Sequence, residues 1–167
     1  TRRLLLPWMS PQRTETYEAM TRDLCNRLID GFIENGSADA AVDYAQQIPV
    51  RVIAHILGVP ESMSEIFTGW VRDTLEFAYD EERRRRGVIG IVQFFVEALK
   101  ERHENPGDDL ISELLMTEVD GEKIDEGVIL GMCGLLLIAG VDTTWSSIGS
   151  SLWHIASHPH DRQRLVN

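Results

Sequence analysis

A short polar cluster interrupts the longest apolar stretch of the chain, in the sequence LLLIAGVDTTWSSIGSSLW. Gly140, Asp142, Thr143 and Thr144 stand there at positions where helix packing alone would favour leucine or alanine. A buried carboxylate is unfavourable unless it is paired or hydrogen-bonded, and a glycine inside a helix costs about 1 kcal/mol relative to alanine. Because both features oppose folding locally, they indicate a functional site. A hydroxyl and a carboxylate side by side can hold a small polar molecule and relay protons.

The threonine hydroxyl of this cluster also has a specific local partner. At four-residue spacing, the Thr143 side chain can bond to the carbonyl oxygen of Ala139, which loosens the backbone hydrogen bond there and opens a kink or groove in the helix. Gly140 leaves space beside it, so the pattern predicts a groove against a flat ligand. The alternative is purely structural: an arginine of another helix holds Asp142 in a salt bridge, and the threonines only bend the helix.

Two further groups of charged or titratable residues indicate structure and not catalysis. His154 and His158 are four residues apart with His160 nearby, and we expect their place near a helix end to serve the helix dipole without forming a metal site. The arginines 83–86 follow the acidic residues 80–82, which predicts ion pairs at four-residue spacing on a solvated helix face.

Helical patterns run along nearly the whole chain, so the elements that position the polar cluster are helices. Apolar residues recur at three- and four-residue spacing between turn signals. The predicted helices cover residues 13–34, 48–57, 62–79, 82–104, 109–116 and 125–157, and a short strand is predicted within 37–43. Gly36 is expected to end the first helix in a left-handed conformation. The predicted fold class is therefore mainly α, with amphipathic helices around a long central helix, and residues 1–167 form a single partial domain.

The predicted helix 125–157 is unusually long for a globular domain. Its roughly 33 residues would span about 50 Å at 1.5 Å per residue. Residues 127–141 carry no charge, so a membrane span is one interpretation, but this stretch is shorter than a typical span and Asp142 follows it directly. We instead expect a helix that crosses the whole molecule and is buried on all sides by other helices.

The composition is that of a soluble globular protein. Of 167 residues, 43% are hydrophobic and 26% charged, and 27 acidic residues against 16 basic ones give a formal net charge of −11. This charge disfavours nucleic acid and anionic membranes as partners, and we expect a cytoplasmic protein. Cys25 and Cys133 lie in apolar helical patterns and are expected to be buried free thiols. With no initiator methionine and no signal peptide pattern, both ends are expected to be cuts through a longer protein.

The string AGVDTT, residues 139–144 of the long helix, resembles the oxygen-binding motif of the cytochrome P450 superfamily, the haem-thiolate monooxygenases. The resemblance extends along the chain through TRRLLLPWMSP, ILGVPE, LIAGVDTTWSS and HPHDRQRL. In this order the strings resemble the middle of a soluble bacterial-type member, from its C helix to the start of its J helix. The resemblance implies that the chain forms the central part of that larger fold.

A role for each residue of the motif follows from the resemblance. Thr143 corresponds to the alcohol and Asp142 to the acid of the family's oxygen-activating pair, which delivers protons. Ala139 and Gly140 correspond to the small residues that face the haem and oxygen, and Thr144 corresponds to a supporting residue. The resemblance thus implies catalytic roles for Asp142 and Thr143 and cofactor contacts for the other three.

The N-terminal string RRLLLPWMSP is similar to the family's C-helix pattern, in which an arginine lies seven residues before an aromatic residue, Ser or Thr, and Pro. This pattern aligns Arg2 with the arginine that binds a haem propionate. A guanidinium suits that role because its fork can hold a carboxylate in a bidentate way. Met9 stands where the family's pattern has the aromatic residue.

The resemblance also implies which segments lie near the substrate. Apolar residues on the segments that resemble the F and G helices would roof the pocket: Val71, Leu75, Phe77, Ala78, Tyr79, Val88, Ile91 and Phe95. The residues one turn before the motif, Leu136, Leu137 and Ile138, would line its distal side.

As a family member, the chain would belong to an enzyme that binds haem b, dioxygen and a lipophilic small molecule, with a ferredoxin or a reductase domain as electron donor. The sequence does not hold the family's haem-ligand loop, so the iron-ligand cysteine is expected outside this chain and the chain by itself is expected to be inactive. One alternative is a non-catalytic α-helical ligand-binding or interaction module in which the Asp142 cluster is a buried polar latch. Another is a catalytically silent family member that lacks the cysteine.

Overall fold

The computed structural model describes residues 2–166, and nearly all of its regular structure is helical. The α-helices are α1 (Arg2–Leu5), α2 (Pro11–Phe32), α3 (Gln47–Leu57), α4 (Ser64–Leu75), α5 (Glu81–Glu104), α6 (Leu110–Met116), α7 (Glu126–Ser157) and α8 (Pro159–Val166). The shorter elements are the 3₁₀-helices η1 (Pro7–Met9), η2 (Ile33–Asn35) and η4 (Glu61–Met63), the π-helix η3 (Ala40–Ala45) and the antiparallel strands β1 (Glu118–Val119) and β2 (Glu122–Lys123). The predicted mainly α fold class is confirmed.

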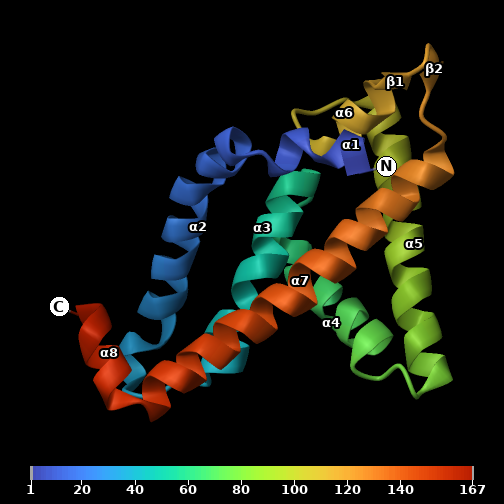
Figure 1. Cartoon of the computed structure of the whole chain (residues 1–167). Helices are drawn as coiled ribbons and strands as arrows, with labels where there is room; N and C mark the ends of the chain where they lie inside the picture. Colours follow the sequence, from blue (N-terminus) through green and yellow to red (C-terminus); the bar gives the residue numbers. More distant parts are fainter. Residues whose placement is uncertain (1, 167) are drawn as a thin grey trace.

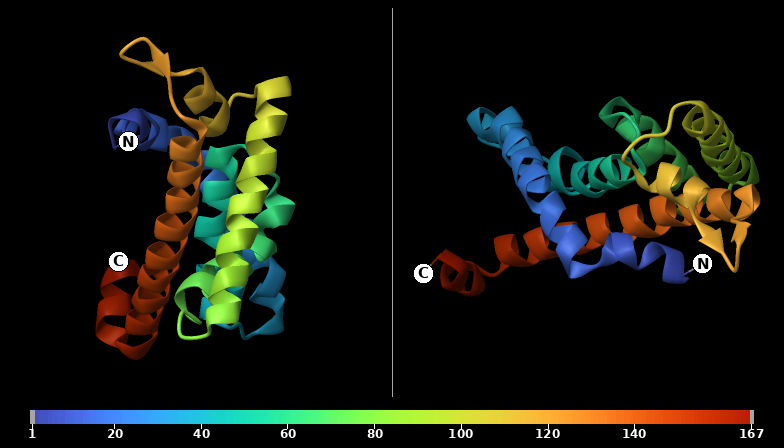
Figure 2. Two further views of the ribbon diagram at one scale, coloured as in Figure 1. Left: turned by 90° about the vertical axis from the view of Figure 1, so that its right-hand side faces the viewer. Right: turned by 90° about the horizontal axis from the view of Figure 1, so that it is seen from above.

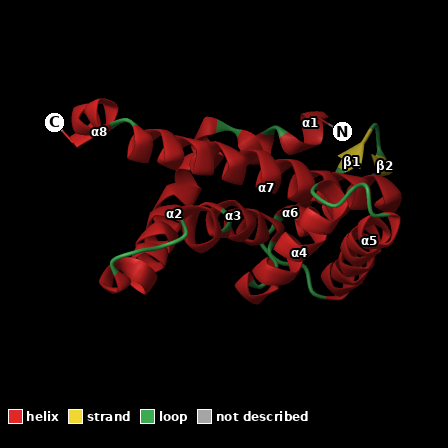
Figure 3. Cartoon of the chain, turned by 90° about the horizontal axis from the view of Figure 1, so that it is seen from below, coloured by secondary structure: helices red, strands yellow, loops and turns green. Residues whose placement is uncertain are grey.

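The helices lie in two layers. Helices α2, α3, α4 and α5 form a row, and α7 crosses this row diagonally (Figure 1). Views from above and from below show α7 on one side of the molecule and the row of helices on the other (Figures 2 and 3). Along its length α7 contacts α5, α6, α4, α3 and η3, and α8 packs at its C-terminal end. The helix that carries the polar cluster is therefore held from one side by most of the other elements.

The apolar core fills the space between α7 and the row of helices. The large side chains that are almost completely buried come from several helices: Leu57 on α3, Phe67 and Val71 on α4, Phe95 on α5, Leu110, Ile111 and Leu114 on α6, and Ile129, Met132 and Leu137 on α7. Burial of such side chains is the main favourable contribution to folding and fixes α7 against its neighbours.

The prediction that α7 is buried on all sides is wrong for the part of the chain that the structure describes. Its extent, Glu126–Ser157, agrees with the prediction to within one residue, but its buried residues face the row of helices. Large apolar side chains lie exposed on the rest of its surface, with Leu135 56% and Trp153 70% exposed. By length and composition α7 could also cross a membrane, a property that it shares with core helices of soluble proteins.

The strand predicted within residues 37–43 is wrong, because a helical cap forms there. One carboxylate oxygen of Asp39 accepts hydrogen bonds from the backbone N–H groups of Ala41 and Val42, at 2.9 and 3.1 Å, and η3 begins at Ala40. Local side-chain bonds of this kind favour a helix start over a strand. The preceding turn is as predicted, since Gly36 has a φ of 69°.

The helix predicted to run to Tyr79 ends earlier, at Leu75. The chain turns within the next few residues, so that Asp80 can cap α5 by accepting hydrogen bonds from the backbone N–H groups of Glu82 and Arg83, both at 3.1 Å. The cap satisfies N–H groups that have no partner within the helix, which is why α5 starts here and α4 does not continue.

The predicted ion pairs of the arginine run are also wrong for Arg83 and Arg86. Both guanidinium groups bind the buried carboxylate of Asp73 on α4, where Nε of Arg83 donates to Oδ1 at 2.9 Å and Nη2 of Arg86 donates to Oδ2 at 2.7 Å. The Arg83 guanidinium also lies 3.4 Å from the ring centroid of Phe77. A shielded carboxylate with two charged donors makes stronger hydrogen bonds than exposed acids one turn away.

Candidate active site

The hydroxyl of Thr143 makes the hydrogen bond that its spacing predicts. Oγ1 of Thr143 donates to the carbonyl oxygen of Ala139 at 2.7 Å. The same arrangement continues along the helix, because Oγ of Ser147 donates to the carbonyl oxygen of Thr143 and Oγ of Ser151 to that of Ser147, both at 2.8 Å. We had no expectation for Ser147 or Ser151, although the four-residue spacing of these hydroxyl residues is visible in the sequence.

Ala139 and Thr143 lie on the face of α7 that no other described element covers. Leu135 precedes Ala139 by four residues and Ser146 follows Thr143 by three, so all four lie on one side of the helix, and all four are exposed. We call these four residues the open stripe. Its side chains are small or apolar and uncharged, with hydroxyl groups at Thr143 and Ser146, so it can lie against a flat apolar ligand and offer a hydroxyl to a small polar molecule.

Asp142 is half-buried at the edge of the open stripe. No ion pair involves its carboxylate among residues 2–166. The arginines that bind buried carboxylates pair elsewhere, Arg83 and Arg86 with Asp73 and Arg102 with Asp109. The salt bridge that the structural alternative requires, between Asp142 and an arginine of another helix, is therefore absent from the described part of the chain. A carboxylate without such a partner is available to take up and release a proton.

Gly140 lies on a different side of α7 from the open stripe, against α3. A Cβ atom added at Gly140 would be 2.9 Å from Cδ1 and 3.2 Å from Cγ1 of Ile53, closer than ordinary van der Waals contact. Gly140 and Ala139 were expected to face the ligand together, but consecutive residues of a helix point about 100° apart. The contact with Ile53 was missed, and no local pattern in the sequence indicates it, because α3 and α7 are distant in the chain.

Thr144 and Arg2 lie outside the open stripe. Thr144 is exposed and makes no side-chain hydrogen bond within the described residues. Arg2 is exposed on α1, in a shallow depression whose walls come from α1, the β1–β2 hairpin and the start of α7: Arg2, Arg3, Leu4, Glu118, Val119, Asp120, Ile124 and Val128. No ion pair involves Arg2 within residues 2–166, so its guanidinium can receive a carboxylate from outside this part of the chain.

The residues expected around a substrate pocket divide into two groups. Core side chains include Val71, Ile91 and Phe95, which are at most 4% exposed. Tyr79 is 82% exposed, and Leu75 and Val88 are also open to solvent. Before the motif, Leu137 is fully buried toward the core. The residue that precedes Ala139 on the open stripe is instead Leu135, which was not expected to line the pocket.

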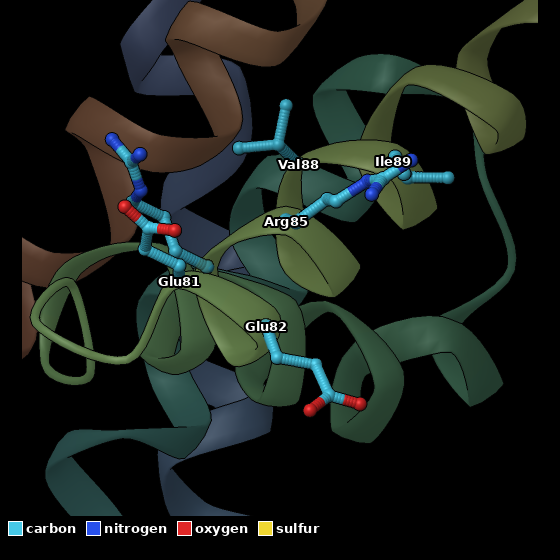
Figure 4. Close-up of a pocket in the computed structure, with 6 residues that line it drawn as sticks. Glu81, Glu82, Arg85, Val88 and Ile89 are labelled. Carbon is cyan, nitrogen blue, oxygen red and sulfur yellow. The ribbon is translucent and has the colours of Figure 1, made fainter.

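A depression at the start of α5 does not include any residue of the motif. It is lined by six exposed residues of that helix: Glu81, Glu82, Arg84, Arg85, Val88 and Ile89 (Figure 4). Because all of its walls belong to one helix, it is an open surface and not an enclosed substrate cavity.

The three histidines meet at the corner between α7 and α8. The rings of His154 and His158 stack with centroids 4.1 Å apart, and Nε2 of His154 lies 3.0 Å from Oδ2 of Asp161. The hydrogen bond with His154 is the main reason why the pKa of Asp161 lies below its ordinary value. No group of three or more side chains among residues 2–166 could hold a metal ion. These contacts join the two helices.

The two cysteines are free thiols in different surroundings. Cys133 is fully buried on the packed side of α7, as expected, and burial raises the pKa of its thiol to about 12. The expectation that Cys25 is also buried is wrong, because this residue on α2 is only half-buried.

Comparison with known proteins points to one family. The sequence profile described as Cytochrome P450 matches residues 63–167. Cytochrome P450 107B1 of Saccharopolyspora erythraea is 26% identical over 166 residues, which are 99% of this chain and 41% of that protein. Vitamin D(3) 25-hydroxylase of Pseudonocardia autotrophica is 30% identical over 157 residues, which are 93% of this chain and 38% of that protein.

Solved structures agree with the sequence comparison. The crystal structure of myxobacterial cytochrome P450 CYP267B1 in complex with myristic acid superposes with a TM-score of 0.88 at 30% identity, over 98% of this chain and 41% of that one. The chain thus spans about two fifths of the length of the relatives that it matches.

Proposed function

The chain belongs to the cytochrome P450 family, and on this premise we propose that the whole protein is a haem-thiolate monooxygenase in which α7 activates dioxygen. One observation carries the proposal: the open stripe places the small Ala139 and the hydroxyl of Thr143 on an uncovered helix face, beside the carboxylate of Asp142. Since the chain spans only 41% of the first of these relatives, the activity is proposed for the whole protein.

The residues of the open stripe suit a haem b group. Leu135 and Ala139 present an apolar surface without charge, against which a flat macrocycle can lie at little desolvation cost. The exposed guanidinium of Arg2 would bind a propionate. When bound, haem supplies the redox chemistry by which dioxygen, two electrons and two protons yield water and one oxygen atom that enters the substrate.

Asp142 and Thr143 would deliver the protons that the reaction consumes. Oγ1 of Thr143 donates a hydrogen bond to the carbonyl oxygen of Ala139, so its lone pairs remain free on the open side and can accept a hydrogen bond from a water or a ligand there. The half-buried carboxyl of Asp142 would take up protons from solvent and pass them to this position. Thr144 would support the pair, and Ala139 would leave room for dioxygen.

The iron ligand would come from a part of the protein outside this chain. Cys133 is fully buried on the packed side of α7 and does not face the open stripe, where the haem would lie. Cys25 lies on α2, away from the open stripe. We infer that neither cysteine of this chain is the ligand.

A lipophilic small molecule is the substrate class that we propose. Leu135 offers an apolar surface directly beside Ala139, and the relatives include a vitamin D(3) hydroxylase and a structure with bound myristic acid, both lipophilic compounds. A ferredoxin or a reductase domain would supply the electrons. We propose a cytoplasmic protein in which α7 is not a membrane span, since the carboxylate of Asp142 in the middle of the helix would be costly in lipid.

A reduced carbon monoxide difference spectrum of the complete reading frame tests the proposal. A thiolate-type, red-shifted Soret band is the expected result and would establish a haem-thiolate protein. If the purified protein retains no haem, membership of the family does not bring the family's activity to this protein. The non-catalytic helical module would then be the better interpretation, although Asp142 forms no ion pair among residues 2–166, which does not favour a buried polar latch.

A further inference from the structure

We propose that Ile53 of α3 is a positioning residue for oxygen activation and acts through its contact with Gly140, an inference that rests on the proposed function. The ideal Cβ position at Gly140 lies 2.9 Å from Cδ1 and 3.2 Å from Cγ1 of Ile53. The contact is thus closer than any residue other than glycine allows without movement of α3, α7 or the isoleucine. Gly140 serves the close approach of two helices and does not itself face the open stripe.

Both sides of this contact are held in place. Gly140 lies between Leu137 and Val141, which are fully buried. Ile53 is only 8% exposed, and its branched Cβ restricts rotation about χ1, so its Cγ1 atom has little freedom to move away. In a close-packed interior such a contact fixes the position of the backbone that it touches.

The contact is linked to the oxygen-activating pair through a single peptide group. The carbonyl that accepts the 2.7 Å hydrogen bond from Thr143 belongs to the peptide that joins Ala139 to Gly140. A displacement of the Gly140 Cα atom therefore moves this acceptor, and with it the orientation of the Thr143 hydroxyl. Ile53 can thus influence the open stripe from the neighbouring side of α7, where Gly140 lies.

Other glycines of α7 do not make such a contact with a neighbouring helix. At Gly134 an added Cβ would be 3.6 Å from Cγ2 of Ile91 on α5, and at Gly149 it would be 4.0 Å from Cβ of Ala45, both ordinary van der Waals distances. At Gly131 nothing described lies within 4 Å. Gly134→Ala is thus a matched control, because it adds the same methyl group to the same helix without a clash.

The test uses the complete, haem-loaded enzyme with Gly140→Ala, Gly134→Ala and the double variant Gly140→Ala with Ile53→Val. The coupling ratio, product formed per pair of electrons consumed, is measured together with hydrogen peroxide, which forms when dioxygen leaves with two electrons and two protons. Because displacements well below 1 Å disturb catalytic geometry, we expect Gly140→Ala to lower the coupling ratio about three- to ten-fold. Gly134→Ala should keep it.

Rescue separates positioning from a general loss of stability. Ile53→Val removes Cδ1, the atom nearest to the added methyl group, and should restore at least half of the coupling that Gly140→Ala loses. The inference is overturned if Gly140→Ala couples normally, if Gly134→Ala uncouples equally, or if Ile53→Val rescues nothing. The carbon monoxide difference spectrum separates failure of this inference from failure of the proposed function. If the proposed function is wrong, the wild-type protein itself shows no thiolate-type band.

Discussion

Nε of Arg102, near the end of α5, donates a 2.7 Å hydrogen bond to Oδ2 of Asp109, which precedes α6. Both side chains are shielded from solvent, with exposures of 13% and 6%. Arg102 also donates to the carbonyl oxygen of Gly58, and the other carboxylate oxygen of Asp109 accepts from the backbone N–H of Ser112 at 2.8 Å. The pair therefore joins the ends of α3, α5 and α6, three helices that all contact α7.

Replacing Asp109 by alanine should destabilise the fold strongly. The change removes the shielded partner of Arg102, leaves it only the exposed carboxylate of Glu101, and removes the cap of α6, so we expect a loss of about 2–4 kcal/mol in the free energy of unfolding. Urea denaturation of the whole protein measures it. Glu97→Ala is the control, because Glu97 forms an exposed pair with Lys100 on α5 and should contribute less than about 1 kcal/mol. Equal effects of both variants would contradict a structural role for Asp109.

The contact between α4 and α5 should weaken in acid through Asp73. Burial by itself raises the pKa of this carboxyl, but hydrogen bonds from Arg86 and Arg83 outweigh burial and leave the pKa below its ordinary value. A carboxyl with a lowered pKa in the folded state stabilises the fold above its unfolded pKa of about 4, and this contribution is lost as the pH falls through the folded pKa.

We therefore expect the stability difference between wild type and Asp73→Asn to be constant near neutral pH and to shrink below about pH 4. Urea midpoints measured along a pH series provide the check. A difference that grows in acid, or that does not change down to the lowest pH at which the protein folds, would show that the Asp73 pKa is not lowered.

Loss of the Thr143 hydroxyl should uncouple electron consumption from product formation. Thr143→Ala removes the group that orients water or ligand beside Ala139, so peroxide formation should rise and product per electron pair should fall about ten-fold or more. Thr143→Ser keeps a hydroxyl and should stay close to wild type. Ser147→Ala is a matched control, since Ser147 makes the same type of bond one turn later, at 2.8 Å. Normal coupling in Thr143→Ala would remove the role assigned to Thr143.

Loss of the Asp142 carboxyl should slow proton delivery without weakening substrate binding. Asp142→Asn keeps the size of the side chain but cannot transfer a proton, so we expect kcat to fall by about 10- to 100-fold, with a larger solvent deuterium isotope effect. Asp142→Glu should recover part of the rate. The dissociation constant of the substrate, measured by spectral titration, should not change. A variant that binds substrate more weakly at unchanged kcat would assign Asp142 to binding and not to proton transfer.

Helix positions followed closely from the sequence wherever local signals were strong. The extent of α7 agreed with the prediction to within one residue, because Asp125 caps its start and Pro159 follows its end. The prediction failed for the strand expected before Tyr44, because Asp39 caps a π-helix there instead.

The residue types of the candidate site could be predicted from the sequence, but the side of α7 on which each residue lies could not. The Thr143 to Ala139 hydrogen bond follows from four-residue spacing, and the structure contains it. Arg83, by contrast, has nearby acids in the sequence but binds Asp73 of another helix, since the choice among several carboxylates depends on which one is shielded from water.

Local patterns were enough to predict the helical fold class, the motif at residues 139–144 and the hydrogen bond of Thr143, because all of these depend on residues within one or two helical turns. The arrangement of the helices was needed to learn that α7 is covered on one side, that Leu135 accompanies Ala139 on the open stripe, and that Gly140 contacts Ile53. The physical reason is that burial and contacts between helices arise from the packing of segments far apart in the chain, which no local spacing encodes.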